Sequence, residues 1–163
     1  MTIYKKSWRR SESGASLVEF AFIAPFLLLL LLGIIEFGYL FGQNNEVRHA
    51  VREGARYAAV SYPDRDGGVV TSSDVVDAVC ATINLPGSTV TVQMDEVDSS
   101  GAVINAGGSA DRGDYGQIAV TATVSSLSGA PLITSFLPSQ LSNSAVFRLE
   151  QDALWTNGAS GSC

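Results

Sequence analysis

The fold is decided by residues 14–41, Gly14-Ala-Ser-Leu-Val-Glu-Phe-Ala-Phe-Ile-Ala-Pro-Phe-Leu-Leu-Leu-Leu-Leu-Leu-Gly-Ile-Ile-Glu-Phe-Gly-Tyr-Leu-Phe41. No residue from Phe20 to Ile35 is charged, and Glu36 is the only charged residue between Phe20 and Phe41. A helix needs about 20 mainly apolar residues to cross a bilayer. The stretch therefore predicts one membrane-spanning helix, because a core helix this apolar would need more surrounding protein than the chain supplies.

A short basic leader precedes the apolar stretch. Its basic residues are Lys5, Lys6, Arg9 and Arg10. A secretory signal peptide carries its cleavage site after the apolar region, and no A-x-A-like site follows Phe41. The candidate processing site therefore lies before the helix, between Gly14 and Ala15.

The helix is expected to continue past the apolar stretch to about Val60, a length of about 65 Å from Leu17 at 1.5 Å per residue. Small and apolar residues recur there at the spacing of one helical face. They are Val47, Ala50, Val51, Gly54, Ala55 and Ala58. Residues 43–62 are thus predicted to be an amphipathic extension of the membrane helix, ended by the Pro and Gly residues at positions 63–68.

Residues 63–163 are predicted to form one small α+β domain, since about 100 residues suit a single domain. Thr71 to Asp74 offer N-cap residues for a short helix that Leu85-Pro86-Gly87 ends. Alternating apolar residues predict strands over 89–97, 115–127 and 145–154, with Val103-Ile104 pairing on the first. The expected fold is a long helix covering one face of a small antiparallel sheet, with a flexible C-terminal tail.

Several polar or strained positions in the long helix are candidates for a role in assembly. Pro25 removes one backbone hydrogen bond, which predicts a kink. Glu36 lies near the outer end of the membrane segment, where it is expected to reach water. The remaining candidates, Arg48, Arg52 and Arg56, follow at four-residue steps. They predict a solvated charged stripe, and contact with acidic neighbours in an assembly is the alternative.

The residues from Arg10 to Tyr57 resemble a known family. A basic leader, a glycine, four residues and then Glu19-Phe20 before a long apolar helix look like the prepilin signal of the tight-adherence (Tad, or Flp) type IV pilus. Within that system, Gly-Ala-Ser-Leu-Val-Glu-Phe-Ala with Pro25, polyleucine and Glu36-Phe37-Gly38 is similar to the TadE-like pseudopilins. Major Flp pilins usually carry Glu-Tyr and lack a large C-terminal domain, so the resemblance favours a minor pseudopilin.

The resemblance implies roles for the residues at the start of the helix. A prepilin peptidase would cut after Gly14 on the cytoplasmic side, and the new α-amino group of Ala15 would pair with Glu19 of an adjacent subunit. A carboxylate in hydrocarbon needs such a partner, because burying it alone costs several kcal/mol. The alternative is that Glu19 lies solvated among lipid headgroups. Because the peptidase of this family works on the cytoplasmic side, the resemblance also implies that the leader is cytoplasmic. The C-terminal domain would then be periplasmic or extracellular.

Cys80 and Cys163 are the only cysteines. Both follow the membrane helix and fall on the side where oxidation is possible, so we expect a disulfide, with two free thiols as the alternative.

No catalytic set, P-loop, metal-ligand cluster or cofactor motif is present in the sequence, so no enzyme activity, metal or cofactor is expected. The formal net charge of -6 makes nucleic acid a poor partner. The expected function is a minor pseudopilin for assembly of a surface pilus in adhesion and biofilm formation, with other pilins and the assembly platform as partners. The alternative is an uncleaved, single-pass scaffold or binding domain of the assembly or secretion machinery.

Overall fold

The computed structural model describes residues 13–60, 71–104, 111–129, 131–150 and 159–163. The leader, the predicted helix stop at 63–68 and the end of the last predicted strand at 151–154 lie outside these residues. The elements are α1 (Ser13–Val60), α2 (Ser72–Thr82), β1 (Val90–Val97), β2 (Tyr115–Thr123), α3 (Pro131–Thr134), β3 (Gln140–Arg148) and β4 (Ala159–Ser162). The strands form one antiparallel sheet in the order β3-β2-β1-β4. The predicted α+β class is therefore confirmed.

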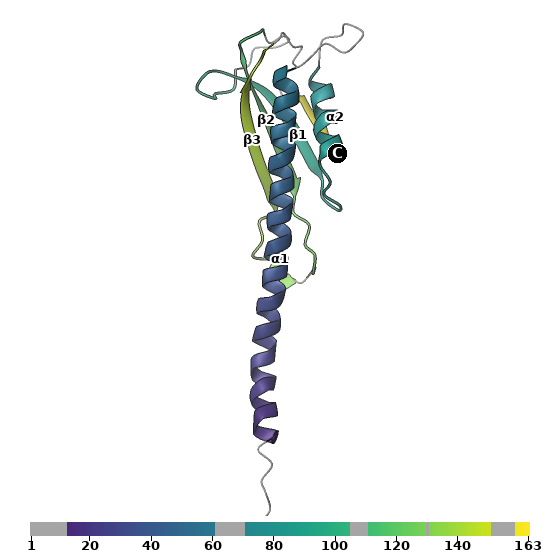
Figure 1. Ribbon diagram of the computed structural model, residues 1–163, viewed down its shortest axis with the longest axis vertical. Coiled ribbons are helices and arrows are strands. Elements are labelled where there is room, and N and C mark those ends of the chain that lie inside the picture. The colour runs from purple at the N-terminus through teal and green to yellow at the C-terminus, as the bar shows by residue number, and fades with distance from the viewer. Residues whose placement is uncertain (1–12, 61–70, 105–110, 130, 151–158) are drawn as a thin grey trace, which may run out of the picture.

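The long helix α1 runs the length of the molecule, and the sheet and α2 pack only against its second half (Figure 1). It contains 48 residues, about 72 Å at 1.5 Å per residue. It begins at Ser13, a turn earlier than predicted, and continues through Pro25 as one helix. The first half projects from the rest of the protein as a single rod, while the second half forms part of the core.

The core lies between the inner face of α1, one face of the sheet and α2. The predicted helical face is buried at Val47, Ala50, Val51, Ala55 and Ala58, and these mostly small side chains allow close packing. At Gly54 an added Cβ would lie 2.5 Å from Val79 Cγ2 and 2.6 Å from Ile118 Cδ1. Gly54 is therefore a point where α1 lies so close to α2 and β2 that a side chain would not fit without a shift.

The two central strands follow the alternation read from the sequence. Val92 pairs opposite Val120 and Met94 opposite Ile118, and all four side chains are buried. The predicted bridge to Val103 forms with Val97. By contrast, β3 starts at Gln140 rather than at the predicted residue 145. The first half of β3 was not predicted, because its sequence shows only weak hydrophobic alternation. Ser142 and Ser144 are exposed there, and the inward-facing residues are only partly buried.

The short helix α2 begins with the predicted cap. Thr71 is the N-cap, and its backbone N–H donates to Asp74 Oδ2 at 2.7 Å. The Thr71 hydroxyl donates to the same oxygen at 2.7 Å, and these hydrogen bonds hold the pKa of Asp74 below its ordinary value. The cap satisfies backbone groups that the first turn of a helix leaves without partners.

The end of the chain differs from the flexible tail expected from its Gly and Ser content. Residues Ala159–Ser162 form β4, which pairs with β1 through Thr91 opposite Ser162. The Cys163 backbone N–H donates to the Val90 carbonyl at 3.0 Å. Gly161 lies so close to Val76 that a Cβ would overlap it, so a residue without a side chain is needed there.

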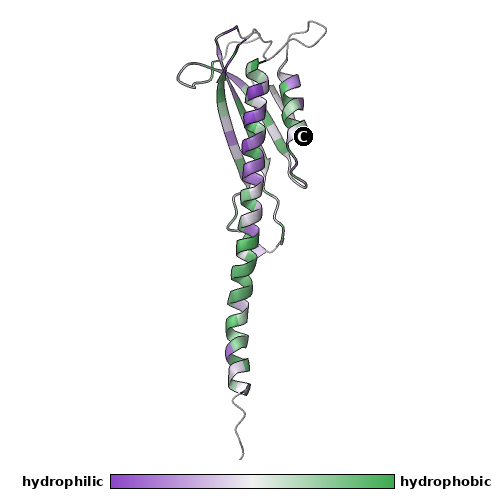
Figure 2. Cartoon of the chain, viewed as in Figure 1, coloured by the Kyte–Doolittle hydropathy of each residue, from purple (hydrophilic) through white to green (hydrophobic). Residues whose placement is uncertain are grey.

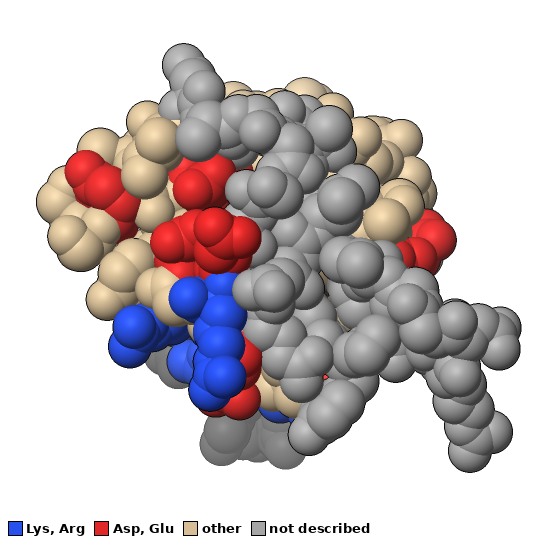
Figure 3. Space-filling view, turned by 90° about the horizontal axis from the view of Figure 1, so that it is seen from above, with Lys and Arg blue, Asp and Glu red and all other residues tan. Residues whose placement is uncertain are grey.

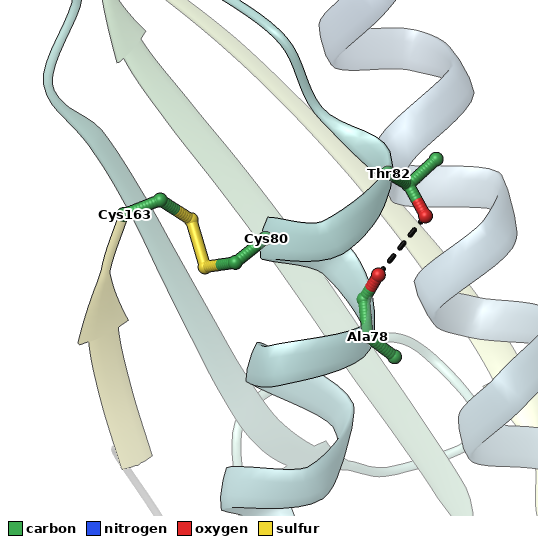
Figure 4. Close-up of a disulfide and its surroundings, with 4 residues drawn as sticks. All are labelled: Ala78, Cys80, Thr82 and Cys163. Atoms are coloured by element: carbon green, nitrogen blue, oxygen red, sulfur yellow. Dashed lines mark hydrogen bonds between the residues drawn. A yellow bond between two sulfur atoms is a disulfide. The ribbon is translucent and has the colours of Figure 1, made fainter.

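A disulfide joins the end of β4 to α2. Cys80 and Cys163 are linked with their Cα atoms 5.6 Å apart, across a sequence separation of 83 residues. Figure 4 shows the bridge running from the last turn of α2 to the residue after β4. It fixes the edge strand to the helix that packs behind it.

Removing this disulfide is expected to destabilise the α+β domain. Closing a loop of this length stabilises a chain by roughly 4 kcal/mol in the chain-entropy model, so the double variant Cys80→Ser/Cys163→Ser should lose up to about that much free energy of unfolding. Urea unfolding followed by circular dichroism measures the loss. Treating the wild type with a reductant should reproduce it, and equal stability of oxidised and reduced protein would show that the bridge contributes nothing.

Candidate functional site

The first half of α1 exposes apolar side chains on every side. In Figure 2 this half of the α1 ribbon is coloured mostly as hydrophobic, and hydrophilic residues become frequent where the sheet begins. Among the largest exposed side chains are Phe20, Phe22, Phe26, Leu28, Leu30, Ile34 and Phe41. α1 is the one helix among the described residues long and apolar enough to cross a membrane, and none of its most apolar window is buried within the protein.

The predicted assembly residues at the start of α1 lie on this exposed rod. Glu19 is exposed, and no hydrogen bond or ion pair joins it to another described residue. Phe20 is 63% exposed. Gly14 and Ala15 lie in the first turn of the helix, one turn before Glu19. The chain itself thus offers Glu19 no described partner, and its pairing with a neighbouring subunit stays a prediction.

Glu36 differs from its prediction, because it does not face water. Glu36 is 1% exposed. Oε1 accepts the backbone N–H of Leu127 at 2.8 Å and Oε2 accepts that of Ser128 at 3.1 Å. The segment that follows β2 reaches down the helix and covers the carboxylate, which the local sequence around Glu36 does not reveal.

Two further side chains on the same face of α1 bind that segment. The Gln43 amide donates to the Ser125 carbonyl at 2.7 Å and accepts the Ser125 backbone N–H at 3.2 Å. The Tyr39 hydroxyl lies 3.3 Å from Ser125 Oγ. We call the contact of Glu36, Tyr39 and Gln43 with residues 125–128 the junction. The only sequence signal for it is the i, i+3, i+7 spacing of polar residues at the end of an apolar helix.

The predicted arginine stripe lies on the solvent face of α1. Arg48, Arg52 and Arg56 are all exposed. Arg56 Nε donates to Glu53 Oε2 at 3.1 Å, and this bond lowers the pKa of Glu53 and raises that of Arg56. The stripe is thus a mixed-charge, solvated face, and its contact with another subunit stays a prediction.

The described residues give little support to a catalytic site. A shallow, open depression beside α1 is lined by Asn45, Glu46, His49 and Thr82. Within the described ranges, no three His, Cys, Asp or Glu side chains come close enough to hold a metal ion. Both cysteines are in the disulfide.

An exposed apolar rod that continues as the core helix of a small α+β head is the arrangement expected of a pilin-like protein. The family model described as TadE-like protein matches residues 14–56, which are the rod and most of the amphipathic extension. The resemblance to the TadE-like proteins of the Tad pilus system is therefore confirmed over this segment. No curated protein and no solved structure matches the chain.

The junction is open to a direct test with Glu36→Gln. A glutamine side chain has one acceptor oxygen, so one of the two N–H groups of Leu127 and Ser128 would face an amide donor. Leaving such a group unsatisfied costs about 1–3 kcal/mol. Amide hydrogen exchange of residues 125–128 should therefore accelerate by about tenfold or more, and the exposed control Glu46→Gln should leave it unchanged. Unaltered protection in Glu36→Gln would show that the carboxylate does not hold the segment.

Proposed function

We propose that the chain is a minor pseudopilin that is needed to assemble a Tad-type surface pilus in adhesion and biofilm formation. The observation that carries the proposal is the TadE-like match, which starts at Gly14, the proposed processing site, and covers the exposed rod. A subunit of this kind acts through contacts rather than catalysis. Its rod inserts in the membrane and packs against other pilins, and its head is presented outside the cytoplasm.

The proposed orientation places residues 1–14 in the cytoplasm, residues 15–42 in the bilayer and residues 63–163 in the periplasm or outside the cell. The leader has four Lys or Arg residues and the segment just beyond the apolar stretch has three, a small excess in the direction of the tendency of Lys and Arg to remain cytoplasmic; the orientation rests mainly on the resemblance. The disulfide between Cys80 and Cys163 agrees with a head in an oxidising compartment. Both observations support the same direction of insertion.

A prepilin peptidase is the proposed processing enzyme, and the bond it would cut joins Gly14 to Ala15. This bond lies in the first turn of α1, where backbone N–H groups have no partners within the helix and the turn unwinds at low cost. An added Cβ at Gly14 would meet no described atom within 4 Å. The glycine therefore has no packing role in the described part of the chain, which agrees with the proposed role in recognition by the peptidase.

Cleavage would create a cation for Glu19. The α-amino group of Ala15 would be largely protonated near neutral pH, and a carboxylate in hydrocarbon is stable only with such a partner. Because the rod is exposed on all sides, the amino terminus of one subunit can approach Glu19 of the next while Phe20 and its apolar neighbours pack between them. The pair would set the register of the two helices.

An uncleaved scaffold of the assembly or secretion machinery is the second candidate. The observation that favours it is that α1 already begins at Ser13, so the helix includes the proposed cleavage site. In that case the leader stays attached and the rod remains a permanent anchor.

Mass spectrometry of the protein from native cell envelopes separates the two candidates. The pseudopilin predicts a chain that begins at Ala15. In the variant Gly14→Leu the bulky side chain at the cleavage site should leave most of the protein uncut, while its folded head is unaffected because Gly14 contacts nothing there. A wild-type protein that retains Lys5, Lys6, Arg9 and Arg10 would contradict the pseudopilin function and leave the scaffold.

The pairing of Glu19 is tested by Glu19→Gln. Removing one partner of a desolvated charge pair costs about 2–5 kcal/mol, so cross-linking of the processed protein to other pilus subunits should fall at least tenfold. Processing itself should continue, because the cut precedes Glu19 and its pairing. The exposed Glu46→Gln serves as the matched control. Normal cross-linking of Glu19→Gln would support the solvated headgroup position instead.

A further inference from the structure

We propose that the described residues of the connection between β2 and β3, 124–129 and 131–139, form a second membrane contact that places Leu127 and Phe136 in the outer interface of the bilayer. The inference rests on the proposed insertion of α1. It adds a lipid-binding surface on the head. Insertion of α1 and lipid contact of the connection can be tested separately.

The first argument is position along the helix. The proposed membrane segment, residues 15–42, is about 40 Å long at 1.5 Å per residue, which matches a bilayer with its headgroup regions. A hydrocarbon core of about 30 Å centred on this segment ends near residue 38, so Glu36 lies within one helical turn of its outer boundary. The Leu127 N–H is hydrogen-bonded to Glu36 at 2.8 Å, so the connection is fixed at the same depth. Figure 1 shows it beside α1 below the sheet.

The second argument is exposure. Phe136 is 79% exposed and Leu127 is 62% exposed, while the neighbouring Ile133 and Leu137 are partly exposed. Apolar side chains of this size gain roughly 1.5–3 kcal/mol each when they leave water. They add exposed apolar surface to a connection that Leu127 joins to the rod through Glu36.

The third argument is charge. From residue 115 to residue 147 the sequence contains no Asp, Glu, Lys or Arg, so the whole connection enters an interface without desolvating a charge. The opposite end of the head is different. Asp98, Asp111, Arg112, Asp114 and Arg148 lie there, beyond or at the ends of β1, β2 and β3, and Figure 3, which looks onto that end, shows its charged side chains.

These observations favour lipid as the occupant over a second protein. The connection is uncharged, lies level with the bilayer boundary and is joined to the rod through the junction, so its apolar surface is continuous with the membrane-spanning surface. Aromatic side chains are favoured at this depth, and amphipathic segments bury their apolar side about 5–10 Å into the headgroup and acyl boundary. Contact of the membrane with both α1 and the connection would hold the head in one orientation relative to the bilayer.

The test uses tryptophan fluorescence of the full chain in vesicles made with lipids brominated near the glycerol end of the acyl chains. Trp8 and Trp155 are replaced by Phe, and a single tryptophan is then introduced by Phe136→Trp. The indole should emit at shorter wavelength and lose about half of its intensity, because it would lie about 5–10 Å below the headgroup boundary. Vesicles holding on average less than one chain exclude contacts between copies.

Two matched variants keep the outcomes distinct. Val103→Trp replaces another exposed apolar residue, about 30 Å away at the other end of the nine-residue β2, and should show no quenching. Phe26→Trp lies near the middle of the membrane segment, so in vesicles of lipids brominated near the methyl ends of the acyl chains it should be quenched if α1 spans the bilayer. Quenching at position 26 with none at 136 would overturn this inference alone, whereas no quenching at 26 would overturn the insertion of α1. A blue-shifted but unquenched indole at 136 would signal a protein neighbour and also overturn the lipid contact.

Discussion

The structure depends on one constraint, which is that the apolar surface of the first half of α1 must be kept from water. At least a dozen Leu, Ile and Phe side chains there are about half exposed or more. At roughly 1.5–3 kcal/mol for each one buried, leaving them in water would cost on the order of tens of kcal/mol, which exceeds the stability of a small domain. Within the described residues, none of the most apolar window of α1 is buried by the rest of the protein, so lipid or other helices must cover it.

The junction marks the point where the surroundings of α1 change. On one side of Glu36 the helix is exposed and apolar, and beyond Gln43 its inner face packs on the sheet and α2. A carboxylate at this position would be costly to bury alone, and two backbone N–H groups from residues 127 and 128 satisfy it. The same hydrogen bonds fix the connection between β2 and β3 to the helix. The head is therefore attached to the rod by specific contacts as well as by the continuous helix.

The elements with strong local patterns could be predicted from the sequence, and those set by distant contacts could not. Alternating residues such as Val92 and Met94 predicted β1, and the cap at Thr71 and Asp74 predicted α2. The first half of β3 and all of β4 lack such a pattern, because the Ser and Gly residues there are ordered by pairing with another strand. Glu36 was placed in water because its partners lie 91 and 92 residues away in the chain. Glu19 and Gly14 were identified by resemblance, and their roles await experiment.

The central claim is that the two halves of α1 are protected from water in different ways, one by lipid and one by the folded head. Hydrogen exchange with mass spectrometry on the full chain in nanodiscs tests this directly. After reduction and addition of enough urea to unfold the head, residues 47–58 should exchange rapidly while residues 20–35 remain protected. If both segments lose protection together, the first half of α1 does not lie in the bilayer and the account is contradicted.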